Sequence, residues 1–191
     1  MLGDGTFAYS GIADRIDSKL AGTTMTIVSL IDSTGEHPML KAELSSLGLP
    51  DLWGPSYWPP YLQPDYDAEE LHPCVIRTSS SSRTANFMWW PIEGVGQGQD
   101  PHVFLTSPGW DLCGLVDRIT ELLHDPARAI YVHCSLGADR TGAVVACYMI
   151  RAHGMNVNEA ISFTSSQTPA GAPNRDYLTL IQAYAAKMGR V

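Results

Sequence analysis

The spacing of apolar residues predicts strands early in the chain and helices late in it. Runs of β-branched and apolar residues with the length of strands occupy residues 24–31, 74–78, 85–92 and 129–132. Residues 39–49 have a helical spacing and include Gly48 near their end, a residue type that commonly ends helices. Early strands followed by clustered helices are typical of an α/β domain with a central mixed sheet flanked by helices.

Four helices are predicted after residue 110. The first has one apolar face and ends before Pro126, and its apolar positions are Leu112, Leu115, Val116, Ile119, Leu122 and Leu123. Residues 141–154 are apolar nearly all round, which predicts a buried central helix. Asn156 with Glu159 forms a capping-box pattern for the next helix, and Asn174 is placed to cap the last one.

The composition indicates one globular domain. The 191 residues include 45% hydrophobic and 17% charged residues, so we expect residues 1–191 to form a single domain. Residues 49–73 are rich in proline and aromatic residues, which excludes a long helix or a central strand there. This segment is predicted to be an ordered insertion, and it could act as a lid, as a specificity wall or only in packing.

The charge and the apolar runs restrict the partners that we expect. Twelve Lys and Arg residues against 20 Asp and Glu residues give a net charge of −8, which disfavours nucleic acid as a partner. No apolar run is long enough for a membrane span, and the first residues lack the pattern of a signal peptide. These observations predict a cytoplasmic protein without a membrane span. They predict nothing about its oligomeric state.

The four cysteines (Cys74, Cys113, Cys134 and Cys147) have irregular spacings and form no Cys-x-x-Cys pair. This pattern fits neither a zinc site nor a disulfide framework, and we expect no metal and no organic cofactor. Three of these residues are predicted to be ordinary reduced thiols. Cys134 differs from them because of the residues that follow it.

Residues Val132 to Gly142, with the sequence Val-His-Cys-Ser-Leu-Gly-Ala-Asp-Arg-Thr-Gly, join a predicted strand to a predicted helix. This layout suits a phosphate cradle, because backbone N–H groups and a helix N-terminus favour an anion. The same features lower the pKa of a thiol, so Cys134 is predicted to be a thiolate that attacks phosphorus. Arg140 is predicted to hold two phosphate oxygens with its guanidinium fork.

The other residues of this loop have predicted supporting roles. His133 is expected to hold the loop from behind by hydrogen bonding, and Thr141 to help the sulfur leave in a second step. Gly137 permits the backbone to turn. Four residues are predicted to bind the phosphate together with Thr141: Ser135, Leu136, Gly137 and Ala138. The alternative for Cys134 is a buried structural thiol.

The pattern His-Cys-x5-Arg-Thr between a strand and a helix resembles the signature of the protein tyrosine phosphatase superfamily. Residues 142–184 also look like the C-terminal half of dual-specificity phosphatases, with a Pro-Asn-x-x-Tyr start to the last helix. The resemblance covers residues 86–184, and residues 24–49 more loosely. It implies a single phosphatase catalytic domain with the cysteine-phosphatase fold of the dual-specificity type.

The resemblance also implies a general acid, an aspartate on a separate loop that protonates the leaving oxygen. The two positions where such relatives carry it hold Ile92 and Gly94 here. Three other carboxyl groups are candidates: Asp100 on a glycine-rich segment, Asp139 inside the phosphate loop, and Glu93 beside an expected position. Asp139 resembles the loop aspartate of myotubularin-like lipid phosphatases and some bacterial tyrosine phosphatases.

The resemblance makes phosphotyrosine in proteins the leading substrate class, with phosphoserine and phosphothreonine also accepted. Phosphoinositides and RNA 5′-phosphates are alternatives, although the loop has no lysine and no arginine besides Arg140. A non-enzymatic alternative is a phosphate-binding module that has lost turnover, since neither expected acid position holds an acidic residue. A sulfurtransferase fits the loop length and its Arg-Thr ending less well.

Overall fold

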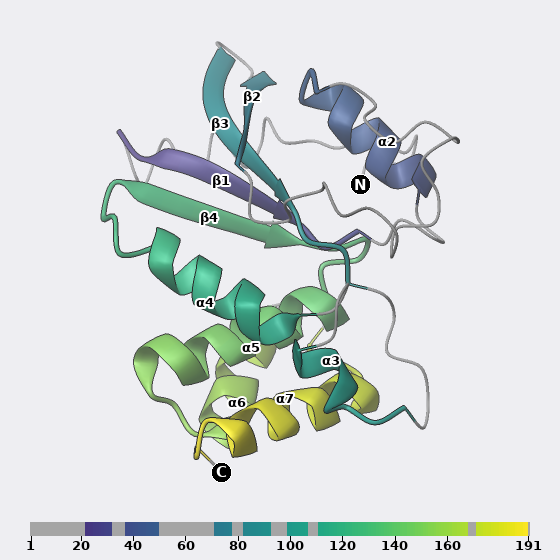
Figure 1. Ribbon diagram of the computed structural model, residues 1–191, viewed down its shortest axis with the longest axis vertical. Helices are drawn as coiled ribbons and strands as arrows, with labels where there is room; N and C mark the ends of the chain where they lie inside the picture. The colour runs from purple at the N-terminus through teal and green to yellow at the C-terminus, as the bar shows by residue number, and fades with distance from the viewer. Residues whose placement is uncertain are drawn as a thin grey trace.

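The computed structural model describes residues 22–31, 37–49, 71–77, 82–92, 99–106, 111–167 and 171–190. Its centre is a four-stranded sheet with the strand order β2-β3-β1-β4 (Figure 1). The strands are β1 (Thr24–Ser29), β2 (His72–Arg77), β3 (Ser82–Trp89) and β4 (Arg128–His133). β1 is parallel to both β3 and β4, whereas β2 is antiparallel to β3. The predicted α/β class with a mixed sheet is therefore confirmed.

Helices cover both faces of this sheet (Figure 1). One face carries α2 (His37–Ser46), and the other face carries the helices of the C-terminal half. These helices are α3 (Val103–Thr106), α4 (Leu112–Leu122), α5 (Asp139–His153), α6 (Val157–Gln167) and α7 (Arg175–Lys187). Within this layer, α5 contacts α4, α6 and α7, as expected for a helix that is apolar nearly all round.

The two faces of β1 supply two separate hydrophobic clusters. Met25 and Ile27 pack with the apolar residues of α2, whereas Val28 and Leu30 pack with those of the C-terminal helices. This division follows from the alternation of side chains along a strand. β4 continues the same division, because Tyr131 contacts the α2 cluster while Val132 contacts the other one.

The predicted helix ends are confirmed in detail. The side chain of Asn156 accepts hydrogen bonds from the N–H groups of Asn158 and Glu159, and Glu159 accepts one from the N–H of Asn156. Asn174 likewise accepts from the N–H groups of Asp176 and Tyr177 at the start of α7. Gly154 ends α5 with a φ of 67°, a conformation that other residues rarely adopt.

Two details differ from the sequence expectations. β2 begins at His72 and includes Pro73, so the last two positions of the expected insertion belong to an edge strand, where proline is tolerated. Residues 50–70 of this insertion lie outside the described residues. The short helix α3 had no sequence signal, because its four residues are fewer than a helical period needs to be recognised.

Candidate active site

The loop from Cys134 to Ala138 connects the end of β4 to the start of α5. Gly137 turns the backbone with a φ of 69°, and a Cβ atom there would meet nothing within 4 Å. The backbone conformation, rather than lack of space, therefore requires glycine at this position. Ala138 is the N-cap of α5 and offers no side chain to its N–H groups. The helix N-terminus is thus left open at this loop, which favours an anion.

Cys134 is buried, with 6% of its surface exposed, and its sulfur accepts a hydrogen bond from the N–H of Gly137 at 3.2 Å. Burial by itself raises the pKa of this thiol. The opposing influences are stronger, so the pKa lies below its ordinary value. They are hydrogen bonds from the side chain and backbone of Thr141, the positive charge of Arg140 and the backbone of Leu136. These groups favour the thiolate, the nucleophilic form of cysteine.

Thr141 lies in the first turn of α5, and its hydroxyl is buried. This hydroxyl has no well-aligned partner among the described residues, yet it lies close enough to the sulfur of Cys134 to lower the pKa of that thiol. The sulfur is therefore the acceptor within its reach. The role of Thr141 as a donor to the departing sulfur stays a prediction.

The guanidinium of Arg140 is held in place by three hydrogen bonds. Nη1 donates to the carbonyl oxygens of Leu30, at 3.2 Å, and Ile92, at 3.1 Å. Nη2 donates to the hydroxyl of Ser135 at 2.8 Å. The chain after β1, the chain after β3 and the loop itself thus converge on one side chain, which fixes the guanidinium beside Cys134.

The remaining loop residues differ in exposure. Leu136 is 83% exposed, although it is apolar, and Ser135 is half-buried where it contacts Arg140. Ala138 gives its carbonyl oxygen to the N–H of Gly142 at 2.8 Å and so starts the hydrogen bonding of α5. Leu136 is therefore the residue of this loop that projects into solvent.

Asp139 forms a link between the loop and α7. Its Oδ1 accepts the backbone N–H of Asn174 at 2.7 Å, and the side chain of Asn174 caps α7. The carboxylate also lies in the first turn of α5, where a negative charge is favourable. This side chain has a structural partner as well as a place in the loop.

The other two candidates for the general acid lie apart from the loop in sequence. Asp100 is exposed, and its Oδ1 accepts the N–H of His102 at 2.9 Å just before α3. Glu93 and Gly94 lie outside the described residues. Ile92, at a position where relatives carry the acid, is 2% exposed and packs in the core.

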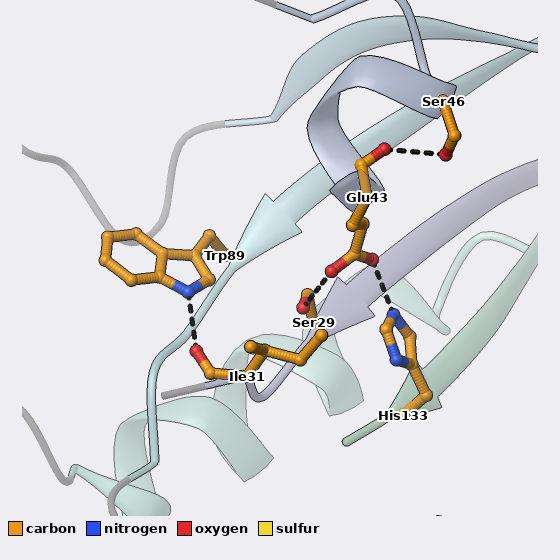
Figure 2. Close-up of polar contacts among 6 residues, drawn as sticks. All are labelled: Ser29, Ile31, Glu43, Ser46, Trp89 and His133. Carbon is orange, nitrogen blue, oxygen red and sulfur yellow. Dashed lines mark hydrogen bonds and ion pairs between the residues drawn. The ribbon is translucent and has the colours of Figure 1, made fainter. Parts of the chain in front are cut away.

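His133 is held by a residue that the sequence analysis missed. Its Nε2 lies 2.7 Å from Oε1 of Glu43, and Oε2 of Glu43 accepts the hydroxyl of Ser29 at 2.7 Å (Figure 2). Glu43 comes from α2, on the opposite face of the sheet from α5. A sequence signal existed, because Glu43 interrupts the buried face of α2 formed by Leu40, Leu44 and Leu47.

The described residues contain neither a cluster that could hold a metal ion nor a helix that could span a membrane. In these segments no group of three or more His, Cys, Asp or Glu side chains is arranged to hold a metal ion. None of the helices in the described part of the chain is long and apolar enough to cross a membrane.

The sequence and the fold are similar to those of phosphatases. Residues 110–187 match the family model of the dual specificity phosphatase catalytic domain. The dual specificity protein phosphatase 1 of Arabidopsis thaliana is 30% identical over 54 residues, and the matched segment spans 28% of this chain and 27% of that protein.

Two solved structures have a similar fold. The human tyrosine phosphatase-like serine/threonine/tyrosine-interacting protein aligns with a TM-score of 0.54 and 12% identity over 96% of this chain and 89% of that one. PTPN18 in complex with HER2-pY1248 phosphopeptides aligns with a TM-score of 0.53 and 13% identity over 95% of this chain and 68% of that one. The chain therefore has the fold of dual-specificity and tyrosine phosphatases, as the sequence predicted.

Proposed function

We propose that this protein is a cysteine-dependent phosphomonoester hydrolase that acts on phosphotyrosine in proteins and also accepts phosphoserine and phosphothreonine. The observation that carries the proposal is the environment of Cys134. This buried thiol has a lowered pKa and lies at the open N-terminus of α5 beside Arg140. A nucleophilic sulfur and an anion cradle occupy the same loop, which is the combination that phosphoryl transfer to cysteine needs.

The reaction would proceed in two steps. The sulfur of Cys134 attacks phosphorus, and the bond to the leaving oxygen breaks as the phosphorus–sulfur bond forms. The leaving oxygen takes a proton from a general acid. Water then attacks the phosphocysteine and gives a proton to the conjugate base of the general acid, the phosphorus–sulfur bond breaks, phosphate is released and the thiolate returns. Arg140 and the N–H groups of the loop stabilise the transferring phosphoryl group, and Thr141 donates to the departing sulfur.

For the general acid we favour Asp100. Asp139 already accepts the N–H of Asn174, so its Oδ1 has a structural role in joining the start of α5 to the residue that caps α7. Asp100 is exposed and lies just before α3. It follows Ile92 in the chain, and the carbonyl of Ile92 accepts a hydrogen bond from Arg140. Glu93 remains the third candidate. A substrate with a poor leaving group would distinguish the three, because only loss of the true acid slows it strongly.

The substrate class rests on two supports. The phosphate loop has no cation besides Arg140, and the chain has a net charge of −8, which is unfavourable for multiply phosphorylated lipid headgroups. PTPN18, which shares the fold, is described in complex with a phosphotyrosine peptide. We therefore place phosphorylated proteins ahead of phosphoinositides and RNA 5′-phosphates.

One observation favours a second candidate function, a phosphate receptor without turnover. Ile92 is buried in the core where phosphatases carry their general acid. A receptor needs the loop and Arg140 but not a thiolate. The lowered pKa of Cys134 therefore weighs towards the enzyme.

The test is phosphate release from a phosphotyrosine peptide, a phosphothreonine peptide and a phosphoinositide, by the wild-type protein and by Cys134→Ser. We expect turnover of the phosphotyrosine peptide by the wild type and none by the variant, with equal thermal stability. Phosphopeptide binding by both proteins without any turnover would instead establish the receptor. Release from the phosphoinositide alone would overturn the proposed substrate class.

A further inference from the structure

A buried glutamate joins two strands directly behind the phosphate loop. Glu43 is 0% exposed and lies in the apolar cluster between α2 and the sheet. Its two carboxyl oxygens contact the ends of different strands, Oε2 at Ser29 on β1 and Oε1 at His133 on β4 (Figure 2). Glu43 and His133 are 90 residues apart in the sequence, so only the fold brings them together.

Ser29 and His133 are the last residues of their strands and face each other in the parallel register. The residue directly after β1 is Leu30, whose N–H donates to the carbonyl of His133 at 2.8 Å and whose own carbonyl accepts from Arg140. The next residue after His133 is Cys134. Glu43 therefore binds the two strands one residue before each of them reaches the active site.

The packing of α2 by itself would favour an apolar residue rather than a carboxyl group at position 43. Leu40, Leu44 and Leu47 fill the rest of the same helix face, and each is nearly or fully buried. An apolar residue at position 43 would complete this face without removing a charge from water. Buried polar groups of this kind have their best-attested use in fixing one arrangement among several.

We propose that Glu43 is a positioning residue of the active site, which acts by holding Ser29 and His133 at once. This link fixes the end of β4, from which Cys134 continues, relative to the end of β1, whose Leu30 carbonyl holds Arg140. The geometry between the sulfur and the guanidinium then depends on a helix on the opposite face of the sheet. For its activity readout alone, this inference rests on the proposed phosphatase function.

The charged and titratable groups around this link come from several elements. Tyr131 of β4 stacks on the ring of His133, with 5.3 Å between ring centroids. Burial of the Tyr131 hydroxyl is the largest influence that raises its pKa, and the negative charges of Glu43 and Cys134 raise this pKa further. On the other face, Arg140 and Asp139 belong to the start of α5, and the charge of Arg140 acts on Cys134. Any pH profile of Cys134 therefore contains contributions from these groups, and the variants below leave Tyr131, Asp139 and Arg140 intact.

The test uses two substitutions of the same residue. Glu43→Leu removes both hydrogen bonds but fills the space with an apolar side chain of similar size. Glu43→Gln keeps the shape, with an oxygen for His133 and an amide N–H₂ that can donate to the hydroxyl of Ser29. Leu44→Ala is the matched control, because it weakens the packing of the same helix and leaves the three polar side chains in place.

The readout is the rate of alkylation of Cys134 by iodoacetamide as a function of pH, followed by mass spectrometry of the peptide that contains it. We expect Glu43→Leu to move the profile upward by about one pH unit, so that alkylation at neutral pH falls about tenfold. Glu43→Gln should stay within about threefold of the wild type, and Leu44→Ala should not move the profile, although it lowers the melting temperature. Where turnover is measurable, kcat should fall in Glu43→Leu more than KM rises.

The outcomes separate the positioning role from the proposed function. An unchanged profile in Glu43→Leu, or an equal shift in Leu44→Ala, would overturn the positioning role whether or not the protein is a phosphatase. If Cys134 of the wild-type protein were alkylated only at the pH of an ordinary thiol, this result would count against the proposed enzyme. In that case hydrogen exchange of residues 132–142 still tests the link, because faster exchange is expected in Glu43→Leu than in Leu44→Ala.

Discussion

The two faces of the sheet each hold a buried cysteine, and the two thiols have opposite properties. Cys134 on the α5 face is 6% exposed, and Cys74 on the α2 face is 4% exposed. The pKa of Cys134 lies below its ordinary value, whereas burial and the charge of Glu43 raise the pKa of Cys74 to about 11. Burial is nearly equal at the two sites, so it does not determine which thiol can act as a nucleophile.

The difference lies in what surrounds each sulfur. Cys134 has the N–H groups of a glycine loop, the hydroxyl of Thr141 and the guanidinium of Arg140. Cys74 lies on β2 in an apolar cluster, where the charge of the Glu43 carboxylate acts on it. The loop between β4 and α5 therefore lowers the pKa of a buried thiol, although burial by itself suppresses ionisation.

The largest effect is expected from removing the cation that acts on Cys134. Arg140→Met takes away both the positive charge near Cys134 and the donors to the carbonyls of Leu30 and Ile92. We expect turnover to fall by about 10²–10³-fold, because a preorganised donor to the phosphoryl group is lost. The pKa of Cys134 should rise towards that of Cys74, which alkylation at a series of pH values measures.

Arg140→Lys separates the two contributions of this side chain. Lysine keeps the positive charge but not the planar fork, so the pKa of Cys134 should move less than in Arg140→Met. Turnover should nevertheless remain strongly reduced. If Arg140→Lys restored turnover to within a few-fold of the wild type, the fork would not be what holds the phosphoryl group.

Much of this arrangement could be predicted from the sequence because it is local. The strand before Cys134, the glycine turn and the helix that begins at Asp139 are contiguous, and the capping side chains of α6 and α7 lie within three residues of the N–H groups from which they accept. Glu43 was missed because its partners, Ser29 and His133, lie on strands far from it in the chain. The general acid could not be assigned, since neither expected position is acidic and three carboxyl groups at other positions are candidates.

A smaller effect is expected from Asp139, which anchors the loop of Cys134 to α7. Asp139→Ala removes the acceptor of the Asn174 N–H and should destabilise the protein by about 1 kcal/mol. Asp139→Asn keeps a carbonyl oxygen for this bond and should retain most of the stability and most of the turnover. Thermal unfolding and turnover of the two variants provide the measurement. If Asp139→Asn were as inactive as Asp139→Ala while remaining stable, Asp139 and not Asp100 would be the general acid.

The smallest effect is expected on the α2 face, from Cys74. Its pKa of about 11 in the folded protein lies above the ordinary value of 9.0, so its contribution to stability is fully present below about pH 9. As the pH rises from 9 to 10 the unfolded chain ionises this thiol and the folded protein does not, which costs about 1 kcal/mol. Cys74→Ala should lose less stability over this interval than the wild type, as urea unfolding at the two pH values would measure.

Leu44→Ala provides the control, because its destabilisation involves no thiol and should leave the alkaline loss unchanged. An equal alkaline loss in Cys74→Ala and the wild type would mean that Cys74 ionises as readily in the folded protein as in the unfolded chain, and the contrast between the two faces would fail on this side of the sheet.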